Sequence, residues 1–238
     1  MSVLSTARRL LYRTVDPTTR NRRKIAGRYL GGEGIEIGAL HNPLDVPKTA
    51  RVRYVDHLPV EKLRQHYPEL ANAPLVDVDI LDDGERLATI ADASQDFVIA
   101  NHFLEHCEDP LGALDNMIRV LRPGGVLYLA VPDKRFTFDV ARPVTPTDHV
   151  LRDHREGPEH SRRGHYEEWA RLVDKAAEPE AHASALLERG YSIHFHAWTQ
   201  WELLEVVKTA AQELKLNFDI ELMLKNRHEV VFVLRRNG

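Results

Sequence analysis

The fold of this chain is decided by residues 96–131, which read DFVIANHFLEHCEDPLGALDNMIRVLRPGGVLYLAV. The apolar runs at 96–100 and 126–131 have the length and composition of buried strands. Between them, apolar residues recur at helical spacing over 113–121, and Pro123-Gly124-Gly125 ends that helix. This order predicts two parallel strands joined by a right-handed crossover.

The same alternation continues on both sides of this stretch. Shorter apolar runs at 34–37, 52–55 and 75–78 are separated by connecting segments, which predicts three more parallel strands. The runs at 218–224 and 229–235 flank a short turn and predict an antiparallel hairpin. We therefore predict an α/β fold: a Rossmann-like, doubly wound, mostly parallel seven-stranded sheet with an antiparallel C-terminal edge hairpin.

Composition divides the chain into four regions. They are an N-terminal helical arm (1–33), the strand-rich cofactor-binding core (34–132), an acceptor-binding insertion or lid rich in His, Asp and Arg (133–190), and a C-terminal helix and hairpin that complete the core (191–238). The arm and the insertion are both candidates for a homodimer contact, because neither has a clear apolar face of its own.

Charge and cysteine content exclude several classes of protein. The net charge of -4 argues against a nucleic-acid partner, and no apolar run approaches the roughly 20 residues that a membrane span needs. Cys107 is the only cysteine, so an intramolecular disulfide is impossible and a reducing, cytoplasmic location is expected. The basic residues of the first two dozen positions are expected to form a solvated arm.

Polar or small residues follow four of the predicted strands. Ligands of open α/β sheets bind beyond these carboxyl ends, so the residues there are candidates for holding a nucleoside cofactor. Asp56 is well placed to accept from ribose hydroxyls, while the absence of a full G-x-G-x-x-G loop disfavours a dinucleotide. The candidate cofactor residues are Glu36, Gly38, Ala39, Asp56, Asp79, Ile80 and Asn101.

Residues 34–132 resemble the class I S-adenosylmethionine-dependent methyltransferases. The resemblance is carried by Leu104-Glu105-His106 after the fourth strand and by Leu-Arg-Pro-Gly-Gly at 121–125, both typical of a large subgroup. The first loop departs from the family, since Leu40-His41-Asn42-Pro43 stands where further glycines are usual.

The resemblance implies S-adenosylmethionine as the cofactor and gives each candidate a role. The loop with Glu36, Gly38 and Ala39 would wrap the methionine moiety, and Asp56 would hold the ribose. Asp79 and Ile80 would contact adenine, and Asn101 would lie near the methionine amino group.

His102, Glu105 and His106 are candidates for a metal site. On a helix these positions share one face, so two imidazoles and a carboxylate would converge on a divalent ion such as Mg²⁺. Some O-methyltransferases of this class bind a metal through a Glu-x-x-Glu-His sequence there. The alternative is that the trio packs against and caps the helix, as in metal-free relatives.

Transfer to a hydroxyl also calls for a general base. His149, which is preceded by Asp148 and followed by Asp153, is the first candidate, and His102 is the second. The alternative for His149 is an ordinary solvated helix start. His194 and His196 alternate on an extended segment, so one of them is expected to face the pocket.

The insertion indicates a polar acceptor. Asp133 and Asp139 are candidates to hydrogen-bond sugar hydroxyls, and Tyr166 offers an aromatic face to a sugar ring. Residues 132–154 resemble enzymes of bacterial polysaccharide metabolism, including the 1-O-methyltransferase of methylmannose polysaccharide. We therefore expect methyl transfer to a hydroxyl of a small-molecule or oligosaccharide acceptor. The alternatives are a phenol- or quinone-type O-methyltransferase and a non-catalytic S-adenosylmethionine-binding module.

Overall fold

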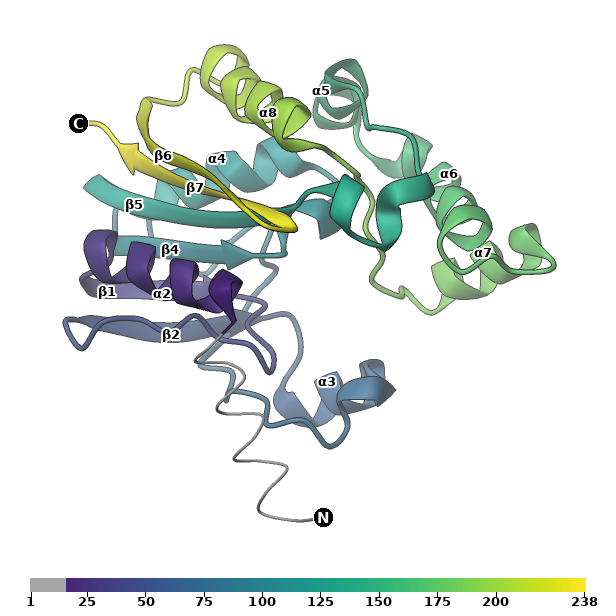
Figure 1. Ribbon diagram of the computed structural model, residues 1–238, viewed down its shortest axis with the longest axis horizontal. Coiled ribbons are helices and arrows are strands. Elements are labelled where there is room, and N and C mark those ends of the chain that lie inside the picture. The colour runs from purple at the N-terminus through teal and green to yellow at the C-terminus, as the bar shows by residue number, and fades with distance from the viewer. Residues whose placement is uncertain (1–15) are drawn as a thin grey trace.

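The computed structural model describes residues 16–238, and its centre is one seven-stranded sheet in the order β3-β2-β1-β4-β5-β7-β6 (Figure 1). Strands β1 to β5 pair in parallel, and β7 is antiparallel to both of its neighbours. The predicted fold class is confirmed. The strands are β1 (Gly32–Ile37), β2 (Ala50–Asp56), β3 (Ile80–Leu81), β4 (Gln95–Asn101), β5 (Leu121–Pro132), β6 (Phe218–Asn226) and β7 (Glu229–Arg236).

Helices cover both faces of the sheet. Alternate residues of β4 point to opposite sides: Val98 packs in the cluster formed with α4 (Pro110–Val120) and α8 (Gln200–Glu213), and Phe97 packs against α2 (Pro17–Tyr29). Figure 1 shows α2 crossing one face while α4 and α8 cover the other. None of the helices in residues 16–238 has both the length and the apolar character that a bilayer crossing requires.

The third strand differs from its prediction. The apolar run 75–78 is outside the sheet, and β3 contains only Ile80–Leu81, paired with the end of β2. The chain joins the sheet edge at Asp79, whose N–H donates to the Tyr54 carbonyl and whose carboxylate accepts from the Tyr54 N–H at 2.8 Å. The earlier Val76 instead donates to the carbonyl of Leu40, so it supports the loop after β1.

The insertion is largely helical. It contains two 3-10 turns, η3 (Lys134–Phe136) and η4 (Phe138–Ala141), and three helices, α5 (Thr147–Glu156), α6 (Glu159–Leu172) and α7 (Pro179–Glu188). Tyr166, Trp169 and Leu186 form a small core of its own, which also takes in Ile193 and Phe195. In Figure 1 these helices stand beside the sheet at the end where β4 and β5 finish.

A buried ion pair fastens α2 to the hairpin. Arg22 Nε donates to Glu229 Oε1 at 2.8 Å, and the Glu229 side chain is fully buried. We expect Arg22→Ala to lower the free energy of unfolding by about 3 kcal/mol, because removing one partner leaves the other charge buried without it. Urea denaturation measures the change. Arg23→Ala, on an exposed position of the same helix, is the matched control, and an equal loss there would contradict the argument.

The same pair predicts a pH dependence. Burial opposes ionisation of Glu229, but hydrogen bonds from Arg22 and His102 outweigh it and lower the pKa of Glu229 to about 2 from 4.5. A lowered carboxyl pKa stabilises the fold above its unfolded value, so this stabilisation is present above about pH 4.5 and lost as the pH falls towards 2. Arg22→Ala should show a smaller acid-dependent loss over that range.

Candidate functional site

An open cavity of about 830 Å³ lies beyond the carboxyl ends of the parallel strands, where open α/β sheets bind their ligands. One side is formed by the sheet and its loops, and the other by the insertion and the segment that follows it. The residues that line it on the sheet side include Gly38, Asp56, His57, Asp83, Gly84 and Phe103, and those on the insertion side include Phe138, Tyr166, Trp169 and His194.

The loop after β1 and the end of β2 meet at this cavity as the sequence predicts. Gly38 has a φ of +62°, which favours glycine, and its N–H donates to the Val55 carbonyl at 3.0 Å. Asp56 is mostly buried, and its Oδ1 atom accepts from the N–H of His57 at 2.8 Å and lies 3.0 Å from its Nδ1. This hydrogen bond raises the pKa of His57. Both contacts use Oδ1, so Oδ2 remains for a ligand hydroxyl.

Glu36 lies beneath the same loop rather than in the large cavity. Its two carboxylate oxygens accept from the Leu44 N–H at 3.0 and 3.1 Å, and Asn101 Nδ2 lies 3.4 Å from Oε1. Burial raises the pKa of Glu36 to about 7. With Ala39, Asn101 and His102 it lines a second cavity, of about 420 Å³, on the side of the loop that faces α2. Glu36 therefore shapes the loop that lacks the family's later glycines.

The structure places Asp79 and Ile80 at the sheet edge, and neither lines the large cavity. Asp83 and Gly84, a few residues farther along, reach it instead. A Cβ on Gly84 would lie 2.5 Å from Ile37 and 2.6 Å from the Phe103 ring, so only glycine fits this close approach. Sequence reasoning missed both residues, although an Asp-Gly pair just after a strand is a typical turn signal.

The predicted metal trio is not assembled. His102 has a φ of +51° and precedes the short 3-10 turn η2 (Leu104–His106), so the three side chains do not share a helix face. His102 Nε2 lies 2.9 Å from Glu229 and its Nδ1 lies 3.7 Å from Glu105. The His106 side chain is directed instead toward the Ile193 carbonyl, which lies 2.9 Å from its Nδ1. The potential ligands are thus split, with Glu105 and His106 beside His194 and with His102 beside His228 and Glu229.

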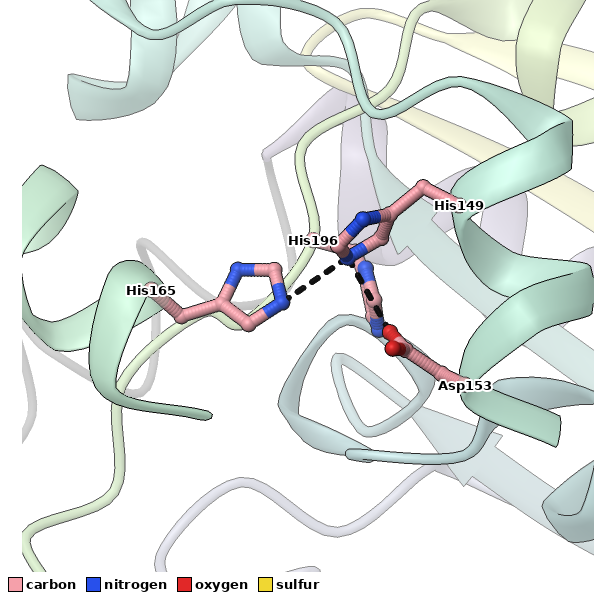
Figure 2. Close-up of side chains that lie close together, drawn as sticks. All are labelled: His149, Asp153, His165 and His196. Carbon is pink, nitrogen blue, oxygen red and sulfur yellow. Dashed lines mark hydrogen bonds and ion pairs between the residues drawn. The ribbon is translucent and has the colours of Figure 1, made fainter. Parts of the chain in front are cut away.

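His149, the first candidate for the base, lies away from the large cavity. It is in the first turn of α5, whose N-cap is Pro146 and has no side-chain cap. Its Nε2 is 3.0 Å from Asp153 Oδ2 and 3.0 Å from His165 Nε2, and His196 completes the group (Figure 2). None of these four residues lines the cavity at the strand ends. His102, the second candidate, does line it, but its Nε2 faces Glu229.

The three acceptor candidates are placed differently from one another. Asp133 is buried against Arg135, 2.6 Å from its Nη2, and is not part of the cavity lining. Tyr166 lines the cavity, and its hydroxyl donates to the Tyr191 carbonyl at 2.9 Å. Asp139 is also buried. It does not line the cavity itself, but its carboxylate contacts His194, which does.

His194 lines the insertion side of the cavity and has a carboxylate behind it. Its Nδ1 lies 2.7 Å from Asp139 Oδ2, and Arg142 Nη1 donates to the other oxygen at 2.9 Å. Burial would raise the pKa of Asp139, but these hydrogen bonds hold it below its ordinary value. An ionised Asp139 favours the tautomer with its proton on Nδ1 of His194, and the other ring nitrogen, Nε2, lies 3.9 Å from Oε1 of the buried Glu105. The rings of Phe138 and Trp169 lie 4.8 and 5.7 Å from the His194 ring.

The sheet side of this cavity is similar to known proteins. Residues 34–129 match the model of a family described as a methyltransferase domain. No curated protein is significantly similar to the chain.

Among solved structures, a methyltransferase of Thermotoga maritima described as dependent on S-adenosylmethionine aligns with a TM-score of 0.52 at 18% identity, over 98% of this chain and 96% of that one. One from Aquifex aeolicus aligns with a TM-score of 0.50 at 13% identity, over 99% and 100%. A Rhodobacter sphaeroides protein described as a zinc-dependent alcohol dehydrogenase aligns with a TM-score of 0.59 at 14% identity, over 94% and 90%.

At such identities the solved structures establish a shared fold, and the family match covers the sheet residues 34–129. The order of the strands, the glycine loop after β1 and the carboxylate at the end of β2 all fit a bound nucleoside donor. Residues 34–129, which are less than half of the chain, are thus similar to a methyltransferase-domain family, and the sheet has the fold of the solved methyltransferases.

Proposed function

We propose that this protein transfers a methyl group from S-adenosylmethionine to a hydroxyl group of a saccharide. The observation that carries the proposal is the His194–Asp139 pair, which faces the same cavity as Gly38 and Asp56. A donor held at the strand ends would thus have a base and a carboxylate within the same enclosure. Nucleophilic attack by an alcohol needs such a base, whereas a more acidic acceptor has less need of one.

Different residues would bind the methyl donor and activate the acceptor. Asp56 and the loop at Gly38 would hold the donor, which supplies an electrophilic methyl group when bound. The acceptor oxygen forms a bond to that methyl group as the sulfur–methyl bond breaks, and the hydroxyl proton passes to His194 Nε2. The products are a methyl ether and S-adenosylhomocysteine, and Asp139 stabilises the imidazolium that results.

The acceptor side of the cavity supports a sugar over a flat phenol. Phe138 and Trp169 offer ring faces for the apolar side of a pyranose, and Phe138 is 56% exposed. His57, Glu85 and Glu108 place hydrogen-bonding groups around the same space. These groups favour an acceptor that carries several hydroxyl groups. The proposal assigns no role to a divalent ion at His102, Glu105 and His106.

An acceptor panel tests this function directly. The protein is incubated with methyl-labelled S-adenosylmethionine and with mono- and oligosaccharides, catechols, hydroquinones and no acceptor. We expect label to appear on saccharides, together with an equal amount of S-adenosylhomocysteine. The matched control is the same sugar with its reacting hydroxyl already methylated. Transfer to phenols alone would contradict the proposal, and donor binding without transfer to any acceptor would favour a non-catalytic binding module.

A further inference from the structure

We propose that His149, Asp153, His165 and His196 bind one transition-metal ion of the Zn²⁺ type as a structural centre of the insertion. The four side chains come from three separate segments: α5 supplies His149 and Asp153, α6 supplies His165, and the extended strand-like segment before α8 supplies His196. Figure 2 shows their polar ends pointing toward one another.

The spacing of the ligand atoms suits a single ion. One nitrogen or oxygen of each residue lies within 4.8 Å of the corresponding atom of the other three. His149 Nε2 is 3.0 Å from both Asp153 Oδ2 and His165 Nε2. Ligands at about 2.0–2.1 Å from a tetrahedral zinc are separated from each other by roughly 3.3 Å. Small movements of the outer members would therefore complete the coordination.

Hydrogen bonds do not satisfy all the polar atoms of these four side chains. Asp153 and His196 are each 1% exposed, and neither the Asp153 oxygens nor the His196 ring nitrogens have a hydrogen bond of regular geometry. His149 Nε2 lies 3.0 Å from both Asp153 Oδ2 and His165 Nε2, but a single ring nitrogen either donates its one proton or accepts one, so it cannot bond to both. A buried polar atom without a partner costs free energy, and a cation at the centre would satisfy all four groups at once.

The ligand set indicates which metal fits. Three imidazoles and one carboxylate suit Zn²⁺ and its neighbours Co²⁺ and Ni²⁺, whereas Mg²⁺ prefers oxygen ligands throughout. All four tetrahedral positions are filled by protein, and none of these residues lines the donor cavity. Both features are typical of a structural site rather than a catalytic one.

Surrounding residues hold the ligands in place. His196 stacks on Trp198 with ring centroids 5.1 Å apart and an interplanar angle of 18°. His160 Nε2 lies 3.4 Å from Asp153 Oδ1, in position to orient the carboxylate from outside the group. His194 is only two residues before His196, so an ion here would fix the segment that carries the proposed base. The metal site itself does not depend on the proposed function.

The test measures metal directly, on full-length protein purified without a histidine tag. The protein is stripped with a chelator, exposed to Zn²⁺ in slight excess and desalted, and bound metal is measured by inductively coupled plasma mass spectrometry. We expect one Zn²⁺ per chain and a rise in Tm of about 5 °C or more over the stripped protein. Co²⁺ in its place should give the visible absorption of a tetrahedral centre.

Variants identify the ligands. His149→Ala, His165→Ala and Asp153→Asn should each weaken Zn²⁺ binding by at least about 10-fold. His149→Ala is the most informative of the three, because its side chain is partly exposed and its loss least disturbs the core. His182→Ala, on α7 and paired with Asp174, is the control that should keep the metal.

The alternative cluster at Glu105, His106 and His194 is tested by His106→Ala. Retention of zinc by His106→Ala and loss by His149→Ala supports the proposal. Loss by His106→Ala with retention by His149→Ala would overturn it, and so would wild-type protein that keeps no metal after desalting. Circular dichroism of every variant separates loss of metal from loss of fold.

Discussion

His194→Ala should lower kcat for methyl transfer by about 10²- to 10⁴-fold, the range in which a positioned general base contributes. The reason is geometric: Asp139 holds Nδ1 of His194 at 2.7 Å, so Nε2 is the atom left to take the acceptor proton. Affinity for S-adenosylmethionine should stay near the wild-type value, because His194 lies on the insertion side of the cavity. Steady-state kinetics with a saccharide acceptor and calorimetry with the donor measure the two effects separately.

Two further measurements distinguish a base from a merely structural residue. Added imidazole should restore part of the activity of His194→Ala, which it would not do for a variant with a disturbed fold. Asp139→Asn keeps the size of the side chain but removes its charge, so it should lower kcat by a smaller factor and leave imidazole rescue absent. His182→Ala is the matched control. Full activity of His194→Ala would remove His194 as the base and return the role to His102, which also lines the cavity.

The parts of the fold that the sequence predicts well are those with a strong local pattern. Strand β4, helix α4 and strand β5 follow from apolar runs and from the Pro-Gly-Gly stop, and the terminal hairpin follows from alternation around its turn. Strand β3 was misplaced because an apolar run at 75–78 resembles a strand. What decides its position is the pairing of Asp79 with Tyr54 across the sheet edge, which no local pattern contains.

The site residues also divide into those that a local sequence pattern predicts and those whose position depends on the fold. Gly38 and Asp56 follow from the rule for strand ends, and both line the cavity. The orientations of the histidine side chains were harder to predict. Several of these residues lie close together in the sequence, and the fold decides which way each side chain points. His102 leaves the expected helix through a positive φ. His194 and His196 alternate along one segment. The Thr145 N–H donates to the Ala197 carbonyl and the Lys134 N–H donates to the Trp198 carbonyl, and these bonds fix which of the two histidines faces the cavity.

The donor side gives the second large effect. Asp56→Ala should weaken binding of S-adenosylhomocysteine by about 100-fold, which corresponds to about 3 kcal/mol. Two hydrogen bonds from ribose hydroxyls to a carboxylate account for a loss of that size, since each bond to a charged group contributes about 1.5–3 kcal/mol. The largely buried position of Asp56 protects these bonds from competing water. Isothermal titration calorimetry with the product measures the affinity without turnover.

Neighbouring carboxylates supply the controls for this experiment. Asp79→Ala should bind almost as tightly as wild type, because Asp79 is exposed at the sheet edge and its carboxylate accepts from Tyr54. Asp83→Ala should weaken binding to an intermediate degree, because Asp83 also lines the cavity. If Asp79→Ala lost as much affinity as Asp56→Ala, the donor would have to reach the outer edge of the sheet. Wild-type affinity in Asp56→Ala would place the ribose elsewhere in the cavity.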